Sequence, residues 1–243
     1  MILVTGFGSG LGRELAVHLS REGASIAGFS RDPDRGRETV DLIQTEGGTA
    51  LFVPVDVSAN EQVESGMAQV IDRFGRLDGV VNCAGARVTG TAVDTSPAQW
   101  DLAIATNLTG TFLVSRAAVP ELLKRQGGSI VNITTTSALR AAPERVAHGV
   151  SKAGVHMLTT SMAIDHASDR IRVNCVCPGP TSLPLTPSDA RDLAGTAKRM
   201  PTGRVGTPSD VAEAVIYMLS DASQHVTGTI LPIDGGLHLT GGL

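Results

Sequence analysis

Short apolar runs, nearly continuous in Val, Ile, Leu and Ala, recur along the 243-residue chain and alternate with longer segments of helical spacing. Strands that helices cover on both faces have this pattern, because neither face meets water. The sequence therefore predicts an α/β fold with a doubly wound parallel sheet of about seven strands and helices on both faces. The predicted strands are Ile2–Thr5, Ala24–Phe29, Ala50–Val55, Gly79–Cys83, Ser129–Ile133, Arg172–Cys177 and Thr229–Ile233.

The chain shows no internal repeat, low-complexity segment or linker, so residues 1–243 are expected to form one domain. The least regular stretch, residues 180–206, is the expected lid over a substrate site. Capping residues mark where several helices begin. They start the segments Ser58–Glu61, Ser96–Gln99, Thr186–Asp189 and Thr207–Asp210, of which Thr186–Asp189 predicts a short extra helix.

Charge and composition argue against large polyanionic partners. The net charge is −4, no five like charges follow one another, and aromatic residues make up 3% of the chain. A nucleic-acid or membrane surface is therefore not expected, and a small-molecule substrate is. The N-terminus lacks the basic flank of a signal peptide and no apolar stretch approaches a membrane span, which predicts a cytoplasmic protein.

The three cysteines, Cys83, Cys175 and Cys177, lie in strand-like apolar runs and are expected to be buried, reduced thiols. Cys175 and Cys177 are expected to point to opposite faces of their strand and so to be unable to share a metal. No His, Cys, Asp or Glu spacing matches a zinc site, so no metal is expected. His156 and the other histidines outside position 148 are interpreted as surface or packing residues.

The strongest motif is the glycine-rich segment from Thr5 to Gly12, which follows the first strand and opens a helix. Glycines allow the left-handed turn and the close approach of backbone N–H groups to a pyrophosphate, and the helix N-terminus adds partial positive charge. The segment predicts a dinucleotide site. Its candidate residues are Thr5, Gly6, Gly8, Ser9, Gly10, Leu11 and Gly12.

The end of the second strand bears on the choice of dinucleotide. An acidic residue usually holds the ribose 2′-hydroxyl of NAD there, but this chain has Ser30 and Arg31. Arginine pairs with a 2′-phosphate, so NADP(H) is favoured over NAD(H). Asp56 and Val57, at the end of the third strand, are expected beside the adenine.

The chain resembles the short-chain dehydrogenase/reductase family over essentially its whole length. The resemblance implies a Rossmann fold, a nicotinamide cofactor, hydride transfer with small carbonyl or alcohol substrates, and a homotetramer or homodimer assembled through the helices that start near Ser96 and Ala147. It also implies further cofactor contacts from the later segments. The motifs that carry it are Thr5–Gly12, Asp56–Val57, Asn82–Gly85, Asn107, Ser151–Ala153, Pro178–Gly179 and the ending Gly228 to Gly236. The further cofactor contacts are Asn82, Ala84, Gly85, Lys152, Pro178, Gly179 and Ser182.

The catalytic half departs from the family pattern. Members usually have a tyrosine four residues before the lysine and a serine thirteen before that tyrosine; here these positions are His148 and Thr135. Asn107 and Lys152 match the pattern, so the expected catalytic set is Asn107, Thr135, His148 and Lys152. Where relatives often have a threonine to contact the carboxamide, this chain has Leu183, beside Ser182.

Three functions stay open from the residues. The first is carbonyl reduction or alcohol oxidation, with His148 in a direct or water-mediated acid–base role. The second is reduction of C=N or activated C=C bonds, which depends less on a tyrosine-like proton donor than reduction of a ketone does. The third is a catalytically degenerate NADP(H)-binding protein with a non-redox role. Three arginines around the expected pocket, Arg87, Arg140 and Arg145, favour an anionic group on the substrate.

Overall fold

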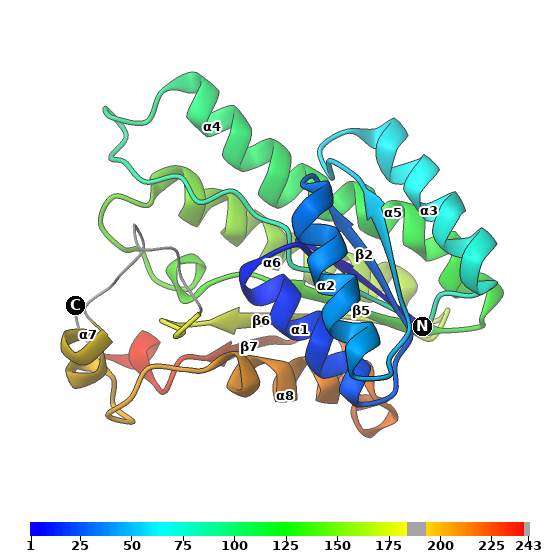
Figure 1. The fold of residues 1–243 in the computed structure, drawn as a ribbon. Coiled ribbons are helices and arrows are strands. Elements are labelled where there is room, and N and C mark those ends of the chain that lie inside the picture. The colour runs from blue at the N-terminus through cyan, green and yellow to red at the C-terminus, as the bar shows by residue number, and fades with distance from the viewer. Residues whose placement is uncertain (184–192, 241–243) are drawn as a thin grey trace.

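The computed structural model describes residues 1–183 and 193–240. Within them, seven strands form one parallel sheet in the order β3-β2-β1-β4-β5-β6-β7, which confirms the predicted doubly wound architecture (Figure 1). The strands are β1 (Ile2–Thr5), β2 (Ile26–Ser30), β3 (Ala50–Pro54), β4 (Gly79–Asn82), β5 (Gly128–Ile133), β6 (Ile171–Pro178) and β7 (Ile230–Ile233).

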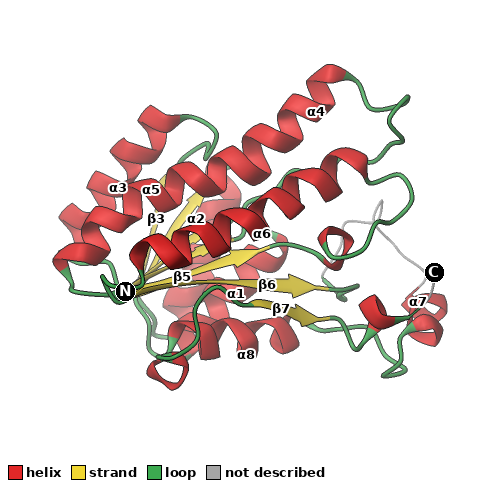
Figure 2. Cartoon of the chain, turned by 180° about the vertical axis from the view of Figure 1, so that it is seen from behind, coloured by secondary structure: helices red, strands yellow, loops and turns green. Residues whose placement is uncertain are grey.

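Helices cover both faces of the sheet, and successive side chains of a strand pack into opposite cores. On β1, Leu3 joins the core under α3, α5 and α6, whereas Ile2 and Val4 join the core under α1, α2 and α8. Figure 2 shows the first of these layers from behind. The helices are α1 (Gly10–Arg21), α2 (Pro33–Thr45), α3 (Asn60–Phe74), α4 (Pro97–Ala103), α5 (Gly110–Lys124), α6 (Val146–His166), α7 (Leu193–Arg199) and α8 (Pro208–Leu219), with shorter turns η1 (Ile104–Thr109, π-helical), η2 (Thr136–Ala138), η4 (Asp221–Ser223) and η5 (Leu237–Leu239).

Local capping chemistry sets two helix starts as predicted. Ser96 and Thr207 each form a capping box with the residue three positions on, Gln99 and Asp210. The box predicted at Ser58 is wrong: both the N–H and the hydroxyl of Ser58 donate to Asp56 Oδ1, so α3 starts one residue later without a side-chain cap. The predicted helix at residues 186–189 lies outside the described residues.

One long helical run corrects the expectation that no apolar segment reaches membrane length. Residues Pro97–Lys124 form 28 consecutive helical residues, long and apolar enough to cross a membrane by length and composition. Half of its most apolar window is buried inside the fold. It also carries the buried polar residues Asn107 and Ser115, which bond to other elements of the core. We therefore interpret it as a core helix.

Hydrogen bonds join the carboxyl ends of β1 and β4, the two neighbouring strands between which the strand order of the sheet reverses. The Thr5 hydroxyl, at the end of β1, accepts the backbone N–H groups of Cys83 and Ala84 at 3.0 and 2.9 Å. Open α/β sheets bind ligands at this switch point, because the following loops diverge from it.

The two ends of the segment expected to form the lid, residues 180–206, are hydrogen-bonded to each other. Gly206 N–H donates to Pro180 O at 2.9 Å, and Ser182 N–H donates back to Gly206 O at 2.8 Å. The segment 180–206 therefore leaves and rejoins the fold at one point, beyond the end of β6. Within it, residues 184–192 are outside the described part of the chain.

Candidate active site

A pocket of about 650 Å³ opens at the carboxyl ends of β1, β2 and β3; we call it the glycine-loop pocket. It brings together nine of the predicted contacts, which are Gly6, Gly8, Ser9, Ser30, Arg31, Asp56, Val57, Ala84 and Gly85. Five neighbours that sequence reasoning missed complete the polar and apolar lining. The full lining is Gly6, Gly8, Ser9, Phe29, Ser30, Arg31, Asp32, Arg35, Val55, Asp56, Val57, Ala84, Gly85 and Thr106.

The glycine loop has the conformation that its sequence predicts. Gly6 has φ +72°, and a Cβ there would lie 3.0 Å from the Ala84 nitrogen. Below the loop, the Phe7 ring fills the space that the missing side chain of Gly28 leaves on β2. Ser9, the N-cap of α1, makes no side-chain cap, so the N–H groups of Gly10, Leu11 and Gly12 remain available for an anion.

The ribose end of the pocket is polar and carries positive charge. The Ser30 hydroxyl is buried and has no hydrogen-bond partner among the described residues. The carboxylate of Asp32 is used as the N-cap of α2, where it accepts the N–H groups of Asp34 and Arg35, and it also lies 3.4 Å from Arg35 Nε. Arg35, missed because it lies one turn into α2, joins Arg31 in the lining.

Asp56, after β3, also lines the glycine-loop pocket. Burial raises the pKa of this carboxyl, but hydrogen bonds from Ser58 and the charge of Arg31 outweigh burial and leave the pKa below its usual value. Asp56 is therefore a charged hydrogen-bond acceptor at neutral pH, and Val57 beside it is buried and apolar.

Other predicted contacts have structural partners instead. Thr5 is buried and accepts from the β4 loop, as described above. The amide of Asn82 points into the core, where it donates to Ser115 Oγ and Asn132 Oδ1, both at 2.9 Å. Neither residue belongs to the described lining of the glycine-loop pocket, and Asn82 Oδ1 is buried without a hydrogen-bond partner among the described residues.

The residues after β6 form part of the lid base. Gly179 N–H donates to Ile233 O at 2.9 Å, and both the N–H and the hydroxyl of Ser182 donate to Gly206 O. Pro178 is buried as the last residue of β6. These residues lie at the carboxyl edge of the sheet but outside the described lining of the pocket.

Asn107, Lys152 and Gly85 converge beside the pocket. Lys152 is buried, and its ammonium donates to Ile133 O at 2.8 Å. A Cβ on Gly85 would lie 3.3 Å from Asn107 Oδ1 and 3.6 Å from Lys152 Nζ. Burial lowers the pKa of Lys152, an effect that the thiols of Cys83, Cys175 and Cys177 oppose. The ammonium is thus fixed at the edge of the glycine-loop pocket.

His148 lies in the first turn of α6, one helical turn before Lys152. Burial, then the Lys152 ammonium, lowers the pKa of His148 to about 4, and a hydrogen bond with the Ala86 backbone only partly opposes the shift. The imidazole is therefore neutral at pH 7. Its Nδ1 is buried without a hydrogen-bond partner among the described residues.

Thr135 caps the short turn η2 that packs against the start of α6. Its hydroxyl accepts the Ser137 N–H at 3.3 Å, which leaves the hydroxyl proton free to be donated. A Cβ on Gly149, next to His148, would lie 3.5 Å from Ser137 O. The fold thus brings the segments that carry Thr135 and His148 into contact.

The prediction that Cys175 and Cys177 point to opposite faces is wrong. Residues two apart in a strand share a face, and their sulfurs lie 3.8 Å from each other. His156 on α6 approaches the same point, with Nε2 3.2 Å from Cys177 Sγ. All three cysteines are free thiols as expected; Cys175 and Cys177 are buried, and Cys83 is partly exposed.

Comparison with known proteins identifies the chain. The family model described as Enoyl-(Acyl carrier protein) reductase matches residues 6–238. A 3-oxoacyl-[acyl-carrier-protein] reductase from Thermotoga maritima is 35% identical, over 97% of this chain and 96% of its own. The chain is a short-chain dehydrogenase/reductase.

Other relatives of this short-chain dehydrogenase/reductase are also oxidoreductases. A 2-(S)-hydroxypropyl-CoM dehydrogenase from Xanthobacter autotrophicus is 36% identical over 98% of this chain and 96% of its own. The solved structure of a putative short-chain alcohol dehydrogenase from Sinorhizobium meliloti superposes with a TM-score of 0.93, at 32% identity and covering 98% of this chain and 96% of that one. The short-chain dehydrogenase/reductase described here is thus an enzyme of the oxidoreductase class.

Proposed function

We propose that this enzyme is an NADP(H)-dependent oxidoreductase that transfers hydride between the nicotinamide and a small carbonyl or alcohol substrate, with a non-standard active site. The observation that carries the proposal is the buried Ser30 hydroxyl in the glycine-loop pocket, which has no hydrogen-bond partner within residues 1–183 and 193–240. A buried polar group without a partner is costly, and a bound 2′-phosphate would satisfy it. Arg31 and Arg35 supply the positive charge that a phosphate needs.

The rest of the glycine-loop pocket fits the remainder of the coenzyme. Gly6, Gly8 and Ser9, with the N–H groups at the start of α1, would hold the pyrophosphate, and Asp56 and Val57 would hold the adenine. Lys152, beside Gly85, would hold the nicotinamide ribose. When bound, NADPH supplies the hydride.

The chain's own residues must then manage the proton. We propose that His148 and Thr135 take the roles of the tyrosine and the serine that the family usually has at these positions. Of the two side chains, only Thr135 carries a hydroxyl proton. Neutral His148 has one ring nitrogen, Nδ1, free to accept a proton. The neutral imidazole would take up a proton from an alcohol, either directly or through a water, and its low pKa makes it a weaker base than an ordinary histidine.

The low pKa of His148 favours a second candidate, reduction of C=N or activated C=C bonds. A group with a pKa of about 4 is almost never protonated at pH 7, so it is a weak proton donor to a developing alkoxide. An iminium already carries its charge and an enolate takes its proton from water, so neither needs this donor. The description of the matching family model, an enoyl reductase, points the same way.

Positive charge around His148 bears on the substrate class. Lys152, Arg145 and Arg87 all lower the pKa of His148 through their charges. The same field would attract a negatively charged group on the substrate. Acidic or thioester-carrier-linked substrates with an anionic end are therefore the class that we propose to test first.

We also propose a homotetramer or homodimer in the cytoplasm. Large apolar side chains of the helical run 97–124 and of α6 are exposed in the single chain, and pairing of these helices would bury them. They are Trp100, Leu102, Phe112, Leu123, Val150, Met157 and Ile164.

The first experiment is calorimetric titration of the purified enzyme with NADPH and with NADH. We expect NADPH to bind at least about tenfold more tightly, the value of one additional charged contact of about 1.4 kcal/mol or more. Binding of neither coenzyme would overturn the proposal. Stopped-flow oxidation of NADPH with ketone, imine and enone panels then separates the two chemistries, and tight binding without turnover on any panel would indicate the non-redox alternative.

A further inference from the structure

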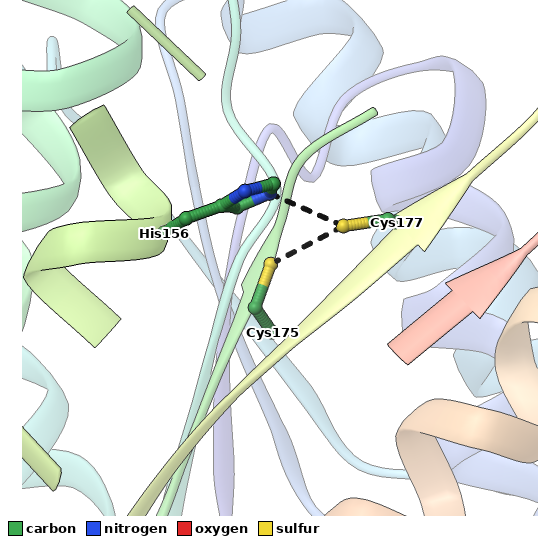
Figure 3. A group of neighbouring side chains, drawn as sticks. All are labelled: His156, Cys175 and Cys177. Carbon is green, nitrogen blue, oxygen red and sulfur yellow. Dashed lines mark hydrogen bonds between the residues drawn. The ribbon is translucent and has the colours of Figure 1, made fainter. Parts of the chain in front are cut away.

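Four donor atoms from three elements meet behind Lys152. Cys175 and Cys177 of β6 place their sulfurs 3.8 Å apart, and His156 Nε2 of α6 lies 3.2 Å from Cys177 Sγ (Figure 3). The Thr134 hydroxyl, just after β5, lies 2.9 Å from His156 Nε2 and 3.1 and 2.8 Å from the sulfurs of Cys175 and Cys177. The atoms offered by His156, Cys175 and Cys177 lie within 4.8 Å of one another.

This cluster is built in the protein interior. Cys175 and Cys177 are fully buried and Thr134 is nearly so, whereas His156 is half-buried. The described lining of the glycine-loop pocket includes none of the four residues. The cluster is thus separate from the proposed coenzyme site.

We propose that His156, Cys175 and Cys177 bind one zinc ion, with the Thr134 hydroxyl at the fourth position. Two sulfurs and one imidazole nitrogen are a donor set that zinc prefers, and Ca²⁺ or Mg²⁺ would require oxygen ligands instead. Two Zn–S bonds of about 2.3 Å at the tetrahedral angle separate the sulfurs by roughly 3.8 Å, so the cysteines need little movement.

Charge balance agrees with a divalent ion. Zinc binding would release the two thiol protons to solvent, and two thiolates with a neutral imidazole and a neutral hydroxyl cancel the charge of Zn²⁺. A neutral assembly is required in the interior, because an uncompensated buried charge is costly.

The ion would join three elements that position the catalytic lysine. His156 is one helical turn after Lys152 on α6, and Lys152 Nζ bonds to Ile133 O, the residue before Thr134. A metal held by α6, β6 and the end of β5 would therefore fix the helix that presents Lys152. We expect zinc to raise the melting temperature of the full chain, since a ligand that binds only the folded state stabilises it.

The test uses the reduced full-length protein, stripped of metal with a chelator and titrated with Zn²⁺ or Co²⁺. We expect one equivalent to bind, with proton release, and the cobalt form to show thiolate-to-cobalt charge-transfer bands together with the strong visible bands of tetrahedral cobalt. Absence of uptake of both metals by the folded wild-type protein would overturn the proposal. So would isolation of Cys175 and Cys177 as a disulfide that, once reduced, takes up neither metal.

Variants locate the site. Cys177→Ser should abolish the charge-transfer bands, and His156→Gln should weaken zinc binding at least about tenfold, since even outer-shell changes cost that much. Cys83→Ser is the matched control, because it removes the one thiol outside the cluster and should leave stoichiometry and spectrum unchanged. Equal loss in Cys83→Ser and Cys177→Ser would contradict the assignment, and the wild-type cobalt spectrum decides the question if a variant fails to fold.

Discussion

The Asn107 amide nitrogen donates to Ser151 Oγ at 2.9 Å and so joins the π-helical turn η1 to the helix that carries Lys152. The same amide group also exchanges two hydrogen bonds with the Ala86 backbone, at 2.7 and 3.0 Å. Both amide hydrogens and one acceptor position of Asn107 are used in these bonds, so its side chain fixes the β4 loop against α6. The helix and the loop meet beside Gly85, at the edge of the glycine-loop pocket.

Replacement of Asn107 by alanine should lower the free energy of unfolding by about 2–4 kcal/mol, because it removes a fully buried side chain, leaves the partly buried Ala86 N–H unpaired and opens a cavity. Urea unfolding checks this. Asn60→Ala is the control: Asn60 also bonds through its amide, but to the exposed side chains of Glu64 and Arg116, so the loss should stay below about 1 kcal/mol. Equal losses would mean that the Asn107 network contributes no special stability.

Arg31→Ala should raise the Michaelis constant for NADPH by about 10- to 100-fold and change that for NADH little, because a charged hydrogen bond to phosphate is worth about 1.5–3 kcal/mol. Steady-state kinetics with both coenzymes measure this. Arg37→Ala removes an arginine of the same helix region that pairs with Asp34 at 3.0 Å and lies outside the pocket lining. A uniform change for both coenzymes would remove the proposed phosphate contact.

Gly28→Ala should destabilise the protein by about 1–3 kcal/mol, because the new methyl group would overlap the Phe7 ring beneath the glycine loop. Phe7→Leu should recover part of this loss, so the two changes should be less than additive in a double-mutant cycle. Gly149→Ala is the control, since its nearest atom, Ser137 O, would lie at an ordinary 3.5 Å. Strict additivity would show that Phe7 and Gly28 do not constrain each other.

The stability of the enzyme should depend on His148 in acid. With a pKa of about 4 in the folded protein and about 6.5 in the unfolded chain, the unfolded state binds more protons between these values, so stability falls as the pH falls from 6.5 to 4. His148→Gln removes this proton uptake. Its stability relative to wild type should therefore be greater at pH 5 than at pH 8, by urea unfolding at both. A difference that does not change with pH would mean that His148 titrates normally.

Met157→Glu should dissociate the proposed assembly. Met157 is 69% exposed on α6 in the single chain, so a carboxylate there would be buried unpaired on association. Light scattering after size-exclusion chromatography measures the mass. Val93→Glu is the control, at a 94% exposed apolar residue in the loop before α4. An unchanged mass for Met157→Glu would direct attention to another surface.

Local patterns predicted most of the fold, because strands, helix caps and the glycine turn are determined by neighbouring residues. All seven strands and the capping boxes at Ser96 and Thr207 are confirmed. The exception at Ser58 arose because Asp56 competes for the same hydroxyl. The sequence alone does not show whether Ser58 bonds to Asp56 or caps the helix.

Side-chain roles that depend on distant partners were not predictable. Thr5 and Asn82 resemble coenzyme ligands in sequence, but their partners lie 78 and 33 residues away or farther. The closeness of Cys175 and Cys177 could have been predicted, since the two-residue period of a strand places them on one face. The approach of His156 could not, because only the packing of α6 against β6 brings this residue to the two cysteines.

The two ends of the segment 180–206 are hydrogen-bonded to each other, so this segment could be exchanged as a unit. Its ends are fixed to each other, so the loop-closure part of a length change costs only about 0.6 kcal/mol for each doubling. Contacts near Gly235 and Gly236, where Met200, Pro201 and Thr202 pack, would have to be kept. Segments from relatives with other substrates could then be grafted between Pro180 and Gly206 while the strands and the glycine turn stay as they are. Divergence of substrate range in this enzyme would need no redesign of its core.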